Sequence, residues 1–590
     1  MMKSWWKKFL VWRVRHIRHQ QFILILSVVV GILSGIAAIT IKNTTHYIQD
    51  WLQGSIINSY YSYLYFLYPV VGILLVVLFL HYVLKLHVGH GIPGALYAIS
   101  RRNGLIKAHN MFSSIITSAL TVGFGGSAGL EGPSVATGSA IGSNLGHVMH
   151  LNYKSRILMI GCAAAGTMSA IFNAPIAAIV FAVEVLMLDL TLSSIVPLLI
   201  SSASASIFSR LLVGGETVFA VNVSQGFELN ESIFFILLGV ICGLISIYVT
   251  RTYHRVSDFF KRFENPFKRW VLAGLGLGLL IFLMPPLYGE GYETINALLA
   301  GKPLSILEGT IWEEYGHHIP VILALIFGLV LFKIVATSLT FAAGGIGGIF
   351  APTLFMGSAL GFVFAFTMNW LTPFQIELGK YALIGMAGLM AGVLHAPLTA
   401  IFLIAELTGG YGLFVPLMIT ASIAFITSRF LQPHSIYNKQ LGERGDLLTH
   451  HTDNNVLTLL QLSKLIERNF LTIGPQQTLG DLVEIVAKSK RNIFPVLDED
   501  QHLLGIVTLD DIRSVMFDQD LYGKVTVREL MHAPLGIVDQ DESMTRVMQK
   551  FRTTGAWNLA VTRDGKYDGF ISKSRLFSAY RSKLQEFSQD

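Results

Sequence analysis

The feature that most constrains this chain is a pair of repeated, helix-breaking motifs in apolar surroundings. "GLEGPSVATGSAIG" (129–142) matches "GIFAPTLFMGSALG" (348–361), and "FNAPIAAIVFAVE" (172–184) matches "LHAPLTAIFLIAE" (394–406). The first pair is offset by 219 residues and the second by 222. Two matches at nearly one offset indicate an internal duplication. In membrane proteins such duplications often place the substrate site near the midplane, between broken helices.

Composition places these motifs in a membrane. The 590 residues are 52% hydrophobic and only 14% charged, outside the usual range of soluble domains. Apolar segments of spanning length occupy 21–41, 64–86, 231–250, 270–287 and 320–341. Shorter apolar stretches, broken by Gly and Pro, occupy 111–123, 156–173, 175–190, 194–213, 353–370, 381–395 and 397–430. Broken helices are tolerated at membrane depth only inside protein or beside an aqueous cavity, so a transporter or channel is expected.

Charge is distributed unevenly along the chain. Residues 1–20 carry six Lys or Arg and no acid, which predicts a basic amphipathic segment on the cytoplasmic face. The first 441 residues hold 25 Lys and Arg against 16 Asp and Glu, whereas the remainder holds 18 against 21. The basic excess therefore indicates membrane orientation and does not indicate nucleic-acid binding. Cys162 and Cys242 lie in apolar runs, which argues against a disulfide framework or a thiolate metal site.

The C-terminal part predicts a soluble α/β tandem. Segment 471–512 has the pattern of strand, helix, strand, turn, strand and the start of a helix. "FPVLDEDQHLLGIVTLDD" and "LAVTRDGKYDGFISKSR" look like two copies, with Gly505 and Gly569 separated by 64 residues. The expected domains are a basic segment at 1–20, a membrane domain at 21–441 with repeats at about 60–215 and 230–430, a linker at 442–454, and soluble copies at 455–516 and 517–586.

Three glycine-proline motifs predict an anion site. They are "GHGIP" (89–93), "GLEGP" (129–133) and "GIFAP" (348–352), and each favours a helix start. A helix start exposes free N–H groups and about half a positive charge, so converging starts can bind an anion without a cationic side chain. The glycines and prolines that form these starts include Pro93, Gly129, Gly132, Pro133, Gly348 and Pro352.

The three motifs, their order and the duplication resemble the CLC family of chloride channels and proton/chloride exchangers, which carries GSGIP, G(K/R)EGP and GxFxP. The resemblance covers roughly residues 20–441, and the tail resembles a pair of cystathionine-β-synthase (CBS) domains. It implies a mainly α, inverted-repeat bundle of broken and tilted helices with a small cytoplasmic α/β CBS tandem. It also implies a homodimer in the lipid bilayer that transports chloride, without catalytic residues, a resident metal or a cofactor. A prokaryotic inner membrane, with the N-terminus and the CBS pair in the cytoplasm, is the expected location.

The resemblance also implies roles for individual residues. Glu131 corresponds to the external gating glutamate, whose ionised carboxylate is displaced by chloride or neutralised by a proton; otherwise Glu131 caps a helix or lies at the water interface. The implied anion-binding residues are Gly89, His90, Gly91, Ile349, Phe350 and Tyr437. For Ile349 and Phe350 the backbone N–H groups are the expected ligands.

The sequence departs from the family pattern in three places. His90 stands where the family has Ser, so it either donates an N–H and titrates, or turns away and leaves the backbone amides to act. Leu130 replaces a usual Lys or Arg, which weakens the attraction of external anions. Val185 follows Glu184 at the position of the inner proton-relay glutamate of many exchangers. Because valine carries no proton, this position favours a channel, and Glu184 itself is expected to be structural.

Several functions remain open at this point. The leading one is a chloride channel gated by Glu131, and the alternative is a proton-coupled antiporter of chloride or another halide. A remote alternative is a CBS-linked intramembrane enzyme, but no histidine begins an H-E-x-x-H motif. A CBS-linked cation transporter would need clustered carboxylates, and only Glu131, Glu184 and Glu406 are expected well inside apolar segments.

The CBS tandem has its own candidate site. "GIVTLDD" places Thr508 and Asp511 where nucleotide-binding CBS domains hold the ribose, which implies an adenine-nucleotide site. The second copy has Arg575 in place of the aspartate. A purely structural or dimerising tandem is the equal alternative.

Overall fold

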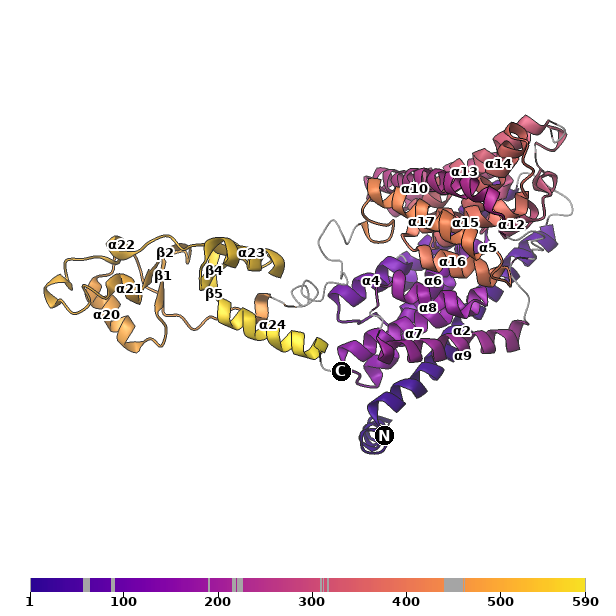
Figure 1. The fold of residues 1–590 in the computed structure, drawn as a ribbon. Helices are drawn as coiled ribbons and strands as arrows, with labels where there is room; N and C mark the ends of the chain where they lie inside the picture. Colours follow the sequence, from indigo (N-terminus) through magenta and orange to yellow (C-terminus); the bar gives the residue numbers. More distant parts are fainter. Residues whose placement is uncertain are drawn as a thin grey trace. The chain divides into compact units, whose positions relative to one another are not determined.

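The computed structural model describes residues 2–56, 64–85, 91–188, 191–214, 219, 227–307, 310, 312–315, 318–439, 460 and 462–588. The chain divides into two compact units, Met1–Leu447 and Leu448–Asp590 (Figure 1). Each unit is described by itself. The expected linker at 442–454 lies outside the described residues.

The first unit is built from helices. They are α1 (Met2–His16), α2 (His19–Ile56), α3 (Leu64–Leu78), α4 (Gly91–Arg101), α5 (Asn110–Gly123), α6 (Glu131–Val148), α7 (Tyr153–Phe172), α8 (Pro175–Glu184), α9 (Leu192–Val213), α10 (Ser232–Lys261), α11 (Pro266–Leu283), α12 (Tyr292–Leu299), α13 (Ile319–Ala342), α14 (Phe350–Leu371), α15 (Leu378–Leu394), α16 (Pro397–Leu407) and α17 (Phe414–Leu431). A π-helical turn, Phe79–Leu84, extends α3. Within the described ranges, nine helices are long and apolar enough to cross a membrane. A multi-pass, mainly α membrane protein is thereby confirmed.

The broken helices follow from local sequence signals. α8 and α16 each begin at a proline, two residues after Asn173 and His395, which have left-handed backbones with φ of 53° and 57°. A proline is tolerated in the first turn of a helix because the N–H that it lacks has no intrahelical partner there. The apolar stretch 397–430, expected as one segment, is two helices, because α16 ends and Gly409 turns the chain at φ 68°.

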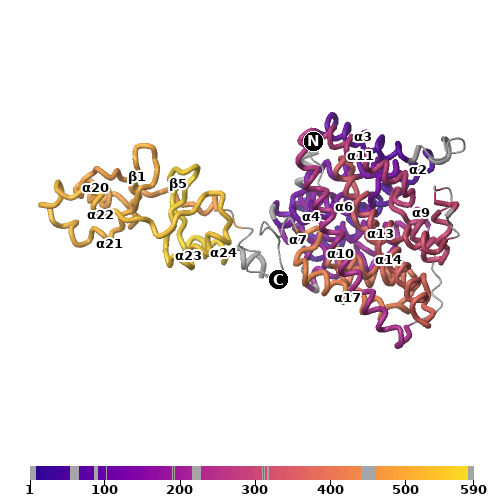
Figure 2. The backbone as a smooth tube through the Cα atoms, turned by 90° about the horizontal axis from the view of Figure 1, so that it is seen from above, coloured from indigo at the N-terminus to yellow at the C-terminus, as the bar shows by residue number. Residues whose placement is uncertain are grey.

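The two halves of the first unit repeat the same packing. α6 packs on α7 in the first half, α14 packs on α15 in the second, and the short helices α8 and α16 contact each other. In Figure 2 the elements of the two halves form one body, with α6, α10, α13 and α14 near its middle. Most side chains of α14 and α15 are buried, which places the core of the unit around these helices.

The second unit is an α/β tandem, as expected. Its strands are β1 (Ile493–Leu497), β2 (Leu503–Thr508), β3 (Ile537–Asp539), β4 (Asn558–Arg563) and β5 (Lys566–Ser572), and its α-helices are α20 (Leu479–Lys488), α21 (Leu509–Ile512), α22 (Val527–Leu530), α23 (Met544–Thr554) and α24 (Lys573–Ser588). β1 and β2 pair antiparallel, and β3–β4–β5 form a second sheet in which β3 and β4 are parallel. The first strand expected in segment 471–512 is reduced to a single bridge from Ile473 to Val496.

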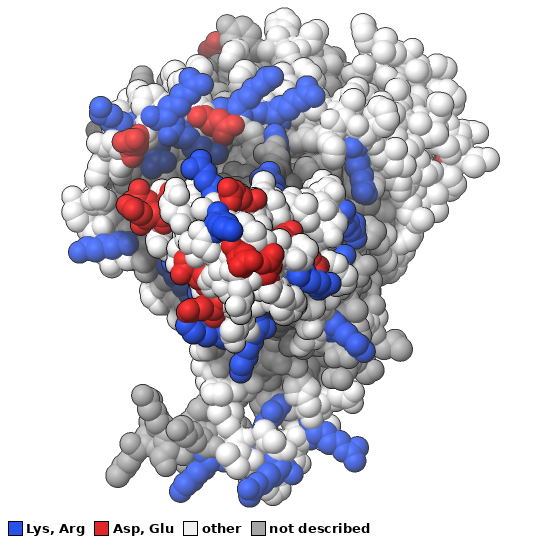
Figure 3. Space-filling model, turned by 90° about the vertical axis from the view of Figure 1, so that its left-hand side faces the viewer, with Lys and Arg blue, Asp and Glu red and all other residues white. Residues whose placement is uncertain are grey.

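Each copy of the tandem has its own apolar core. One cluster centres on Phe494, Val496 and Val507, and the other on Val538, Phe551 and Leu559. Leu462 lies within the range expected for the first copy, 455–516, but packs in the core of the second copy, so the two copies are interlocked. Figure 3 shows Lys and Arg interspersed with Asp and Glu in the central part of the face turned to the viewer, and Lys and Arg without acids at its lower end.

Candidate anion site

Three helix starts meet in the first unit. Gly91 begins α4 with φ of 53°, and a Cβ added to it would lie 3.0 Å from the carbonyl oxygen of Gly132 in α6. A Cβ on Gly348, just before α14, would lie 2.8 Å from the Gly132 nitrogen. Gly129 and Gly348 also exchange backbone hydrogen bonds of 2.9 and 2.7 Å. The starts of α4 and α14 therefore each approach the Gly132 backbone of α6 at a glycine.

A second pair of bonds shows that the two halves are related by a local twofold. The N–H of Ser127 donates to Thr340 Oγ1 at 3.1 Å, and the N–H of Ile346 donates to Thr121 Oγ1 at 3.0 Å. Each donor and each acceptor lies 219 residues from its counterpart. Such an exchange of equivalent bonds requires that each half present the same surface to the other.

Glu131 occupies the start of α6. Its side chain is fully buried, and its Oε1 accepts a hydrogen bond of 2.8 Å from the hydroxyl of Tyr292 in α12. Oε2 accepts no hydrogen bond of good geometry from the described residues and lies on the side of the first turn of α14, where the Ala351 amide faces the carboxylate. The equivalent position in the other repeat is Phe350, 219 residues later. One repeat thus places an acid, and the other an aromatic ring, at the meeting point.

Tyr437 is buried, and its hydroxyl has no hydrogen-bond partner among the described residues. It lies near enough to Glu131 and Tyr253 to interact with them electrostatically. Buried polar groups are almost always hydrogen-bonded, so this hydroxyl is available to donate to a ligand. An anion would accept from it.

The remaining residues of the three motifs fall at helix starts. Pro93, Pro133 and Pro352 are each the third residue of α4, α6 and α14. Ile349 and Phe350 are the N-cap and first residue of α14, and both are buried. Because they stand at the helix start, their N–H groups have no intrahelical acceptor. The Phe350 ring packs against other phenylalanines, with centroids 5.4 and 6.4 Å away. Gly89 and His90 lie outside the described residues.

Two charged residues that the sequence did not single out, Glu290 and Lys333, lie next to the segments that lead into this site. The N–H of Leu130 donates to Glu290 Oε1 at 3.2 Å. Lys333 of α13 is fully buried, and its Nζ donates to the carbonyls of Leu287 and Gly289 at 3.1 and 2.9 Å. A lone lysine inside the apolar run 320–341 was the available signal. A charged lysine inside a membrane is energetically costly, so it is expected to have polar partners nearby.

The first unit buries a further glutamate beyond the three expected well inside apolar segments. Glu231 is also buried and forms a 2.6 Å ion pair with the fully buried Lys380. Glu231 was missed because it stands at the edge of an apolar segment, and Lys380 because it precedes one. Among the described residues, no three His, Cys, Asp or Glu side chains group as metal ligands.

Glu184 and Glu406 act as reciprocal helix caps. Each lies at the C-terminal end of its short helix and accepts two N–H bonds from the first turn of the other one. Glu184 accepts from Leu398 at 3.1 Å and Thr399 at 2.8 Å, and Glu406 accepts from Ile176 at 3.1 Å and Ala177 at 2.8 Å. Val185 follows as a buried residue whose N–H bonds to the Phe181 carbonyl. This position therefore offers only an apolar side chain.

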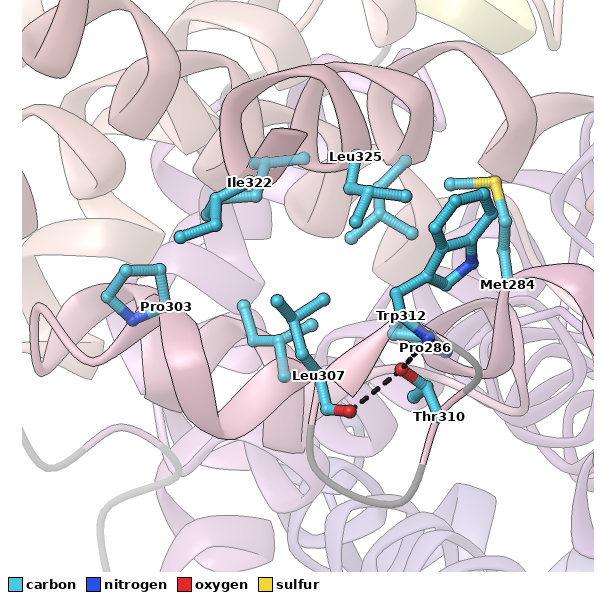
Figure 4. Close-up of a pocket in the computed structure, with 11 residues that line it drawn as sticks. Met284, Pro286, Pro303, Leu307, Thr310, Trp312, Ile322 and Leu325 are labelled. Carbon is cyan, nitrogen blue, oxygen red and sulfur yellow. Dashed lines mark hydrogen bonds between the residues drawn. The ribbon is translucent and has the colours of Figure 1, made fainter. Parts of the chain in front are cut away.

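A further pocket in the first unit is apolar. The side chains around it include Met284, Pro286, Leu307, Trp312 and Ile322, contributed by the segment after α11, the segment between α12 and α13, and α13 (Figure 4). Its labelled hydrogen bonds, from Trp312 N to Thr310 and from Thr310 to the Leu307 carbonyl, hold the loop at its edge. It does not contain the glycine-rich helix starts.

In the second unit, Thr508 and Asp511 lie together at the start of α21. Asp511 Oδ2 accepts from the Thr508 N–H at 2.7 Å and from its hydroxyl at 2.6 Å, and His532 Nε2 lies 3.2 Å away. Burial opposes ionisation, but these contacts lower the pKa of Asp511 below its ordinary value. The carboxylate is therefore ionised at neutral pH and already engaged as a helix cap.

Comparison with known proteins adds a family to this geometry. The family described as voltage gated chloride channel matches residues 72–429, and the CBS domain matches 462–518 and 527–582. The H(+)/Cl(-) exchange transporter ClcA of Vibrio cholerae is 29% identical over 445 residues, which cover 71% of this chain and 89% of that protein. Two solved structures share the fold. A slow cyanobacterial Cl-/H+ antiporter has a TM-score of 0.61 at 24% identity, over 72% of this chain and 97% of that one. A eukaryotic CLC transporter has a TM-score of 0.59 at 17% identity, over 94% and 97%.

Proposed function

This chain belongs to the voltage gated chloride channel (CLC) family, with a C-terminal CBS pair, and we propose that it conducts chloride through a pore gated by Glu131. The observation that carries the proposal is the position of Glu131: a fully buried carboxylate at the meeting point of three helix starts. Such starts favour an anion. A carboxylate placed there acts as a tethered competitor for the transported ion.

The surrounding groups suit a transported anion. The free hydroxyl of Tyr437 and the N–H groups of Gly91, Ile349 and Phe350 supply donors without a formal positive charge. A site of this kind binds an anion strongly enough to admit it and weakly enough to release it. His90 and Gly89, which belong to the α4 motif, complete the proposed set of ligands.

A channel-like mode is favoured by Val185. A proton crossing from the inner side needs a titratable group beyond Glu131, and the buried valine provides none at the family's relay position. Proton-coupled antiport of chloride or another halide is the second candidate, because relatives and structural neighbours are named as H+/Cl- exchangers. In that mode, Glu131 would exchange protons through water or through His90.

Reversal potentials decide between these modes. The purified protein would be reconstituted in liposomes with a fixed chloride gradient, and proton and chloride electrodes would be read together while a pH gradient is imposed. A passive channel keeps the chloride reversal potential at every pH gradient and moves no protons. A reversal potential that shifts with the pH gradient, together with proton flux driven by chloride, would establish the antiporter instead.

The remaining assignments follow from the family and the domain pattern. We propose a homodimer with one pore per subunit, residing in a prokaryotic inner membrane with the N-terminus and CBS pair in the cytoplasm. The proposed division into residues 21–441, 455–516 and 517–586 keeps the linker at 442–454. An adenine nucleotide bound at Thr508 and Asp511 would compete with the present cap contacts of Asp511. Saturation of the protein with ATP, followed by thermal unfolding, tests that site: a raised Tm that is lost in Asp511→Ala supports it.

A further inference from the structure

The connection between α11 and α12, residues 284–291, is fastened to the loop that leads into Glu131. The N–H of Gly289 donates to the Gly125 carbonyl at 3.1 Å. Gly125 has φ of 91°, and a Cβ there would lie 1.8 Å from the Tyr288 ring, so the ring occupies the space that a side chain would need. Further along, Glu290 accepts the N–H of Leu130. The connection therefore contacts the loop before Glu131 at both Gly125 and Leu130.

The same connection sets the position of Tyr292. Gly291 has φ of 86°, and a Cβ there would lie 2.5 Å from Phe355, so only glycine fits at this turn. The turn makes Tyr292 the first residue of α12, with its ring centroid 5.8 Å from that of Phe219 and its hydroxyl on Glu131 Oε1. The Nζ of Lys333 donates to the carbonyls of Leu287 and Gly289, just before this turn.

We propose that Tyr292 is a positioning residue for the gate. Its hydroxyl holds the ionised Glu131 carboxylate in the closed position, and Glu290 on the same connection sets how readily that carboxylate takes a proton. The proposal rests on the gating role proposed above for Glu131. We call the hydrogen bond between the Tyr292 hydroxyl and Glu131 the latch. This bond must break whenever chloride displaces the Glu131 carboxylate.

The charges around Glu131 give the two residues opposite effects. The groups that face Glu131 or its neighbour Glu290 are Tyr292 of α12, Tyr437 after α17, the Ala351 amide of α14, Lys333 of α13 and Lys42 of α2. A hydroxyl that donates to a carboxylate favours the ionised form, whereas a neighbouring carboxylate favours the protonated form. Burial and the nearby Glu131 raise the pKa of Glu290 to about 8. Loss of the Tyr292 hydroxyl should thus make protonation of the gate easier, and loss of the Glu290 carboxyl should make it harder at the pH values where Glu290 is ionised.

The test compares Tyr292→Phe and Glu290→Gln by chloride flux from proteoliposomes across a range of pH. Tyr292→Phe keeps the ring on Phe219, and its pH midpoint should rise by about one unit, the size expected for one hydrogen bond to a charged group. Glu290→Gln keeps an acceptor for Leu130, and its midpoint should fall. Tyr248→Phe, which removes a hydroxyl bonded to the Leu331 carbonyl, is the matched control and should leave the midpoint in place.

The outcomes separate the latch from the gate. In a Glu131→Gln background the added Tyr292→Phe change should have no further effect, because no carboxylate remains to be held. If Glu131→Gln keeps the wild-type pH dependence, the proposed gate itself is wrong. If Glu131→Gln abolishes it while Tyr292→Phe and Glu290→Gln leave the midpoint unchanged or move it in the same direction, the gate stands and the latch is overturned.

Discussion

Gly129 and Gly348 donate a backbone hydrogen bond to each other, at 2.9 and 2.7 Å, in an antiparallel bridge between the two repeats. The bridge lies immediately ahead of α6 and α14, so it fixes the distance between their starts. An anion site built on these two starts is therefore rigid at its centre. In the proposed gate, the side chain of Glu131 is the part that moves.

Glu131→Gln should remove most of the dependence of chloride flux on pH. The amide keeps the size of the side chain but cannot ionise, so it no longer competes with chloride at the helix starts. Flux at neutral pH should rise to the level that wild type reaches in acid, as measured with a chloride electrode. Glu293→Gln, an exposed change in the first turn of α12, should behave as wild type. Unaltered pH dependence in Glu131→Gln would contradict the gating role.

Tyr437→Phe should weaken chloride binding by about tenfold, the loss expected for one hydrogen bond to a charged acceptor. Isothermal titration of chloride into detergent-solubilised protein measures the change. Tyr381→Phe is a close control, because Tyr381 also has a buried hydroxyl without a hydrogen-bond partner among the described residues, but its ring packs on Phe235 and Phe364. Equal losses in both variants would show that the effect is structural.

Glu406→Ala should destabilise the protein without changing the pH dependence of flux. The N–H groups of Ile176 and Ala177 lose their acceptor, at a cost of about 1–3 kcal/mol. The Tm in detergent, at a fixed scan rate, should fall by several degrees. Glu406→Gln keeps an acceptor oxygen and should lose less. A shifted pH midpoint in either variant would assign the glutamate a role in transport.

Lys380→Met should be strongly destabilising, by about 3–5 kcal/mol, because it leaves Glu231 buried without its cation. Replacing both residues, as Lys380→Met with Glu231→Gln, should recover most of the loss, since no buried charge remains. Thermal unfolding of the two variants beside wild type measures the difference. If the double variant is as unstable as the single one, the ion pair is not the source of the effect.

In the second unit, Asp568 should contribute stability at neutral pH that disappears in acid. Two hydrogen bonds from Arg468, at 2.9 and 2.8 Å, lower the pKa of Asp568 from its ordinary value of 3.8. A depressed pKa stabilises the fold above the unfolded value and loses that effect as pH falls through the folded one. Because Arg468 is half-exposed, Asp568→Asn should cost less than about 1 kcal/mol at pH 7.

Calorimetric unfolding of the full-length protein at pH 7 and near pH 3 checks this difference. The gap between wild type and Asp568→Asn should close at the lower pH. Asp564→Asn, in the neighbouring turn, is the control and should match wild type at both values. A gap that persists in acid would show that the carboxylate charge is not responsible.

The sequence was sufficient for the fold because its repeated breaks are local signals. Pro175 and Pro397 start their helices where the motif predicts, and the nearly equal offsets of the motifs match the reciprocal bonds between the repeats. The α/β tandem was predictable from its alternating strands for the same reason. The single bridge at Ile473 was not, because strand pairing depends on a partner elsewhere in the chain.

The site was only partly predictable. Glu131 was conspicuous as a lone acid in a glycine-rich motif, but nothing near Tyr292 marks it as a partner, since 161 residues separate the two. Glu290 lies in a loop, where acids are common, so the sequence does not show that it contacts the site. Lys333 was visible in its apolar run, yet its partners are backbone carbonyls, which carry no sequence signature. Polar contacts between segments that are distant in the sequence can thus be identified only from the three-dimensional structure.

The reciprocal caps of α8 and α16 bear on how such a chain arose. Each repeat supplies the carboxylate that completes a helix start in the other, so a single repeat would leave its own start uncapped and its own glutamate unpaired. An ancestral half-length protein would have met both needs only by pairing with a second copy of itself in the opposite sense.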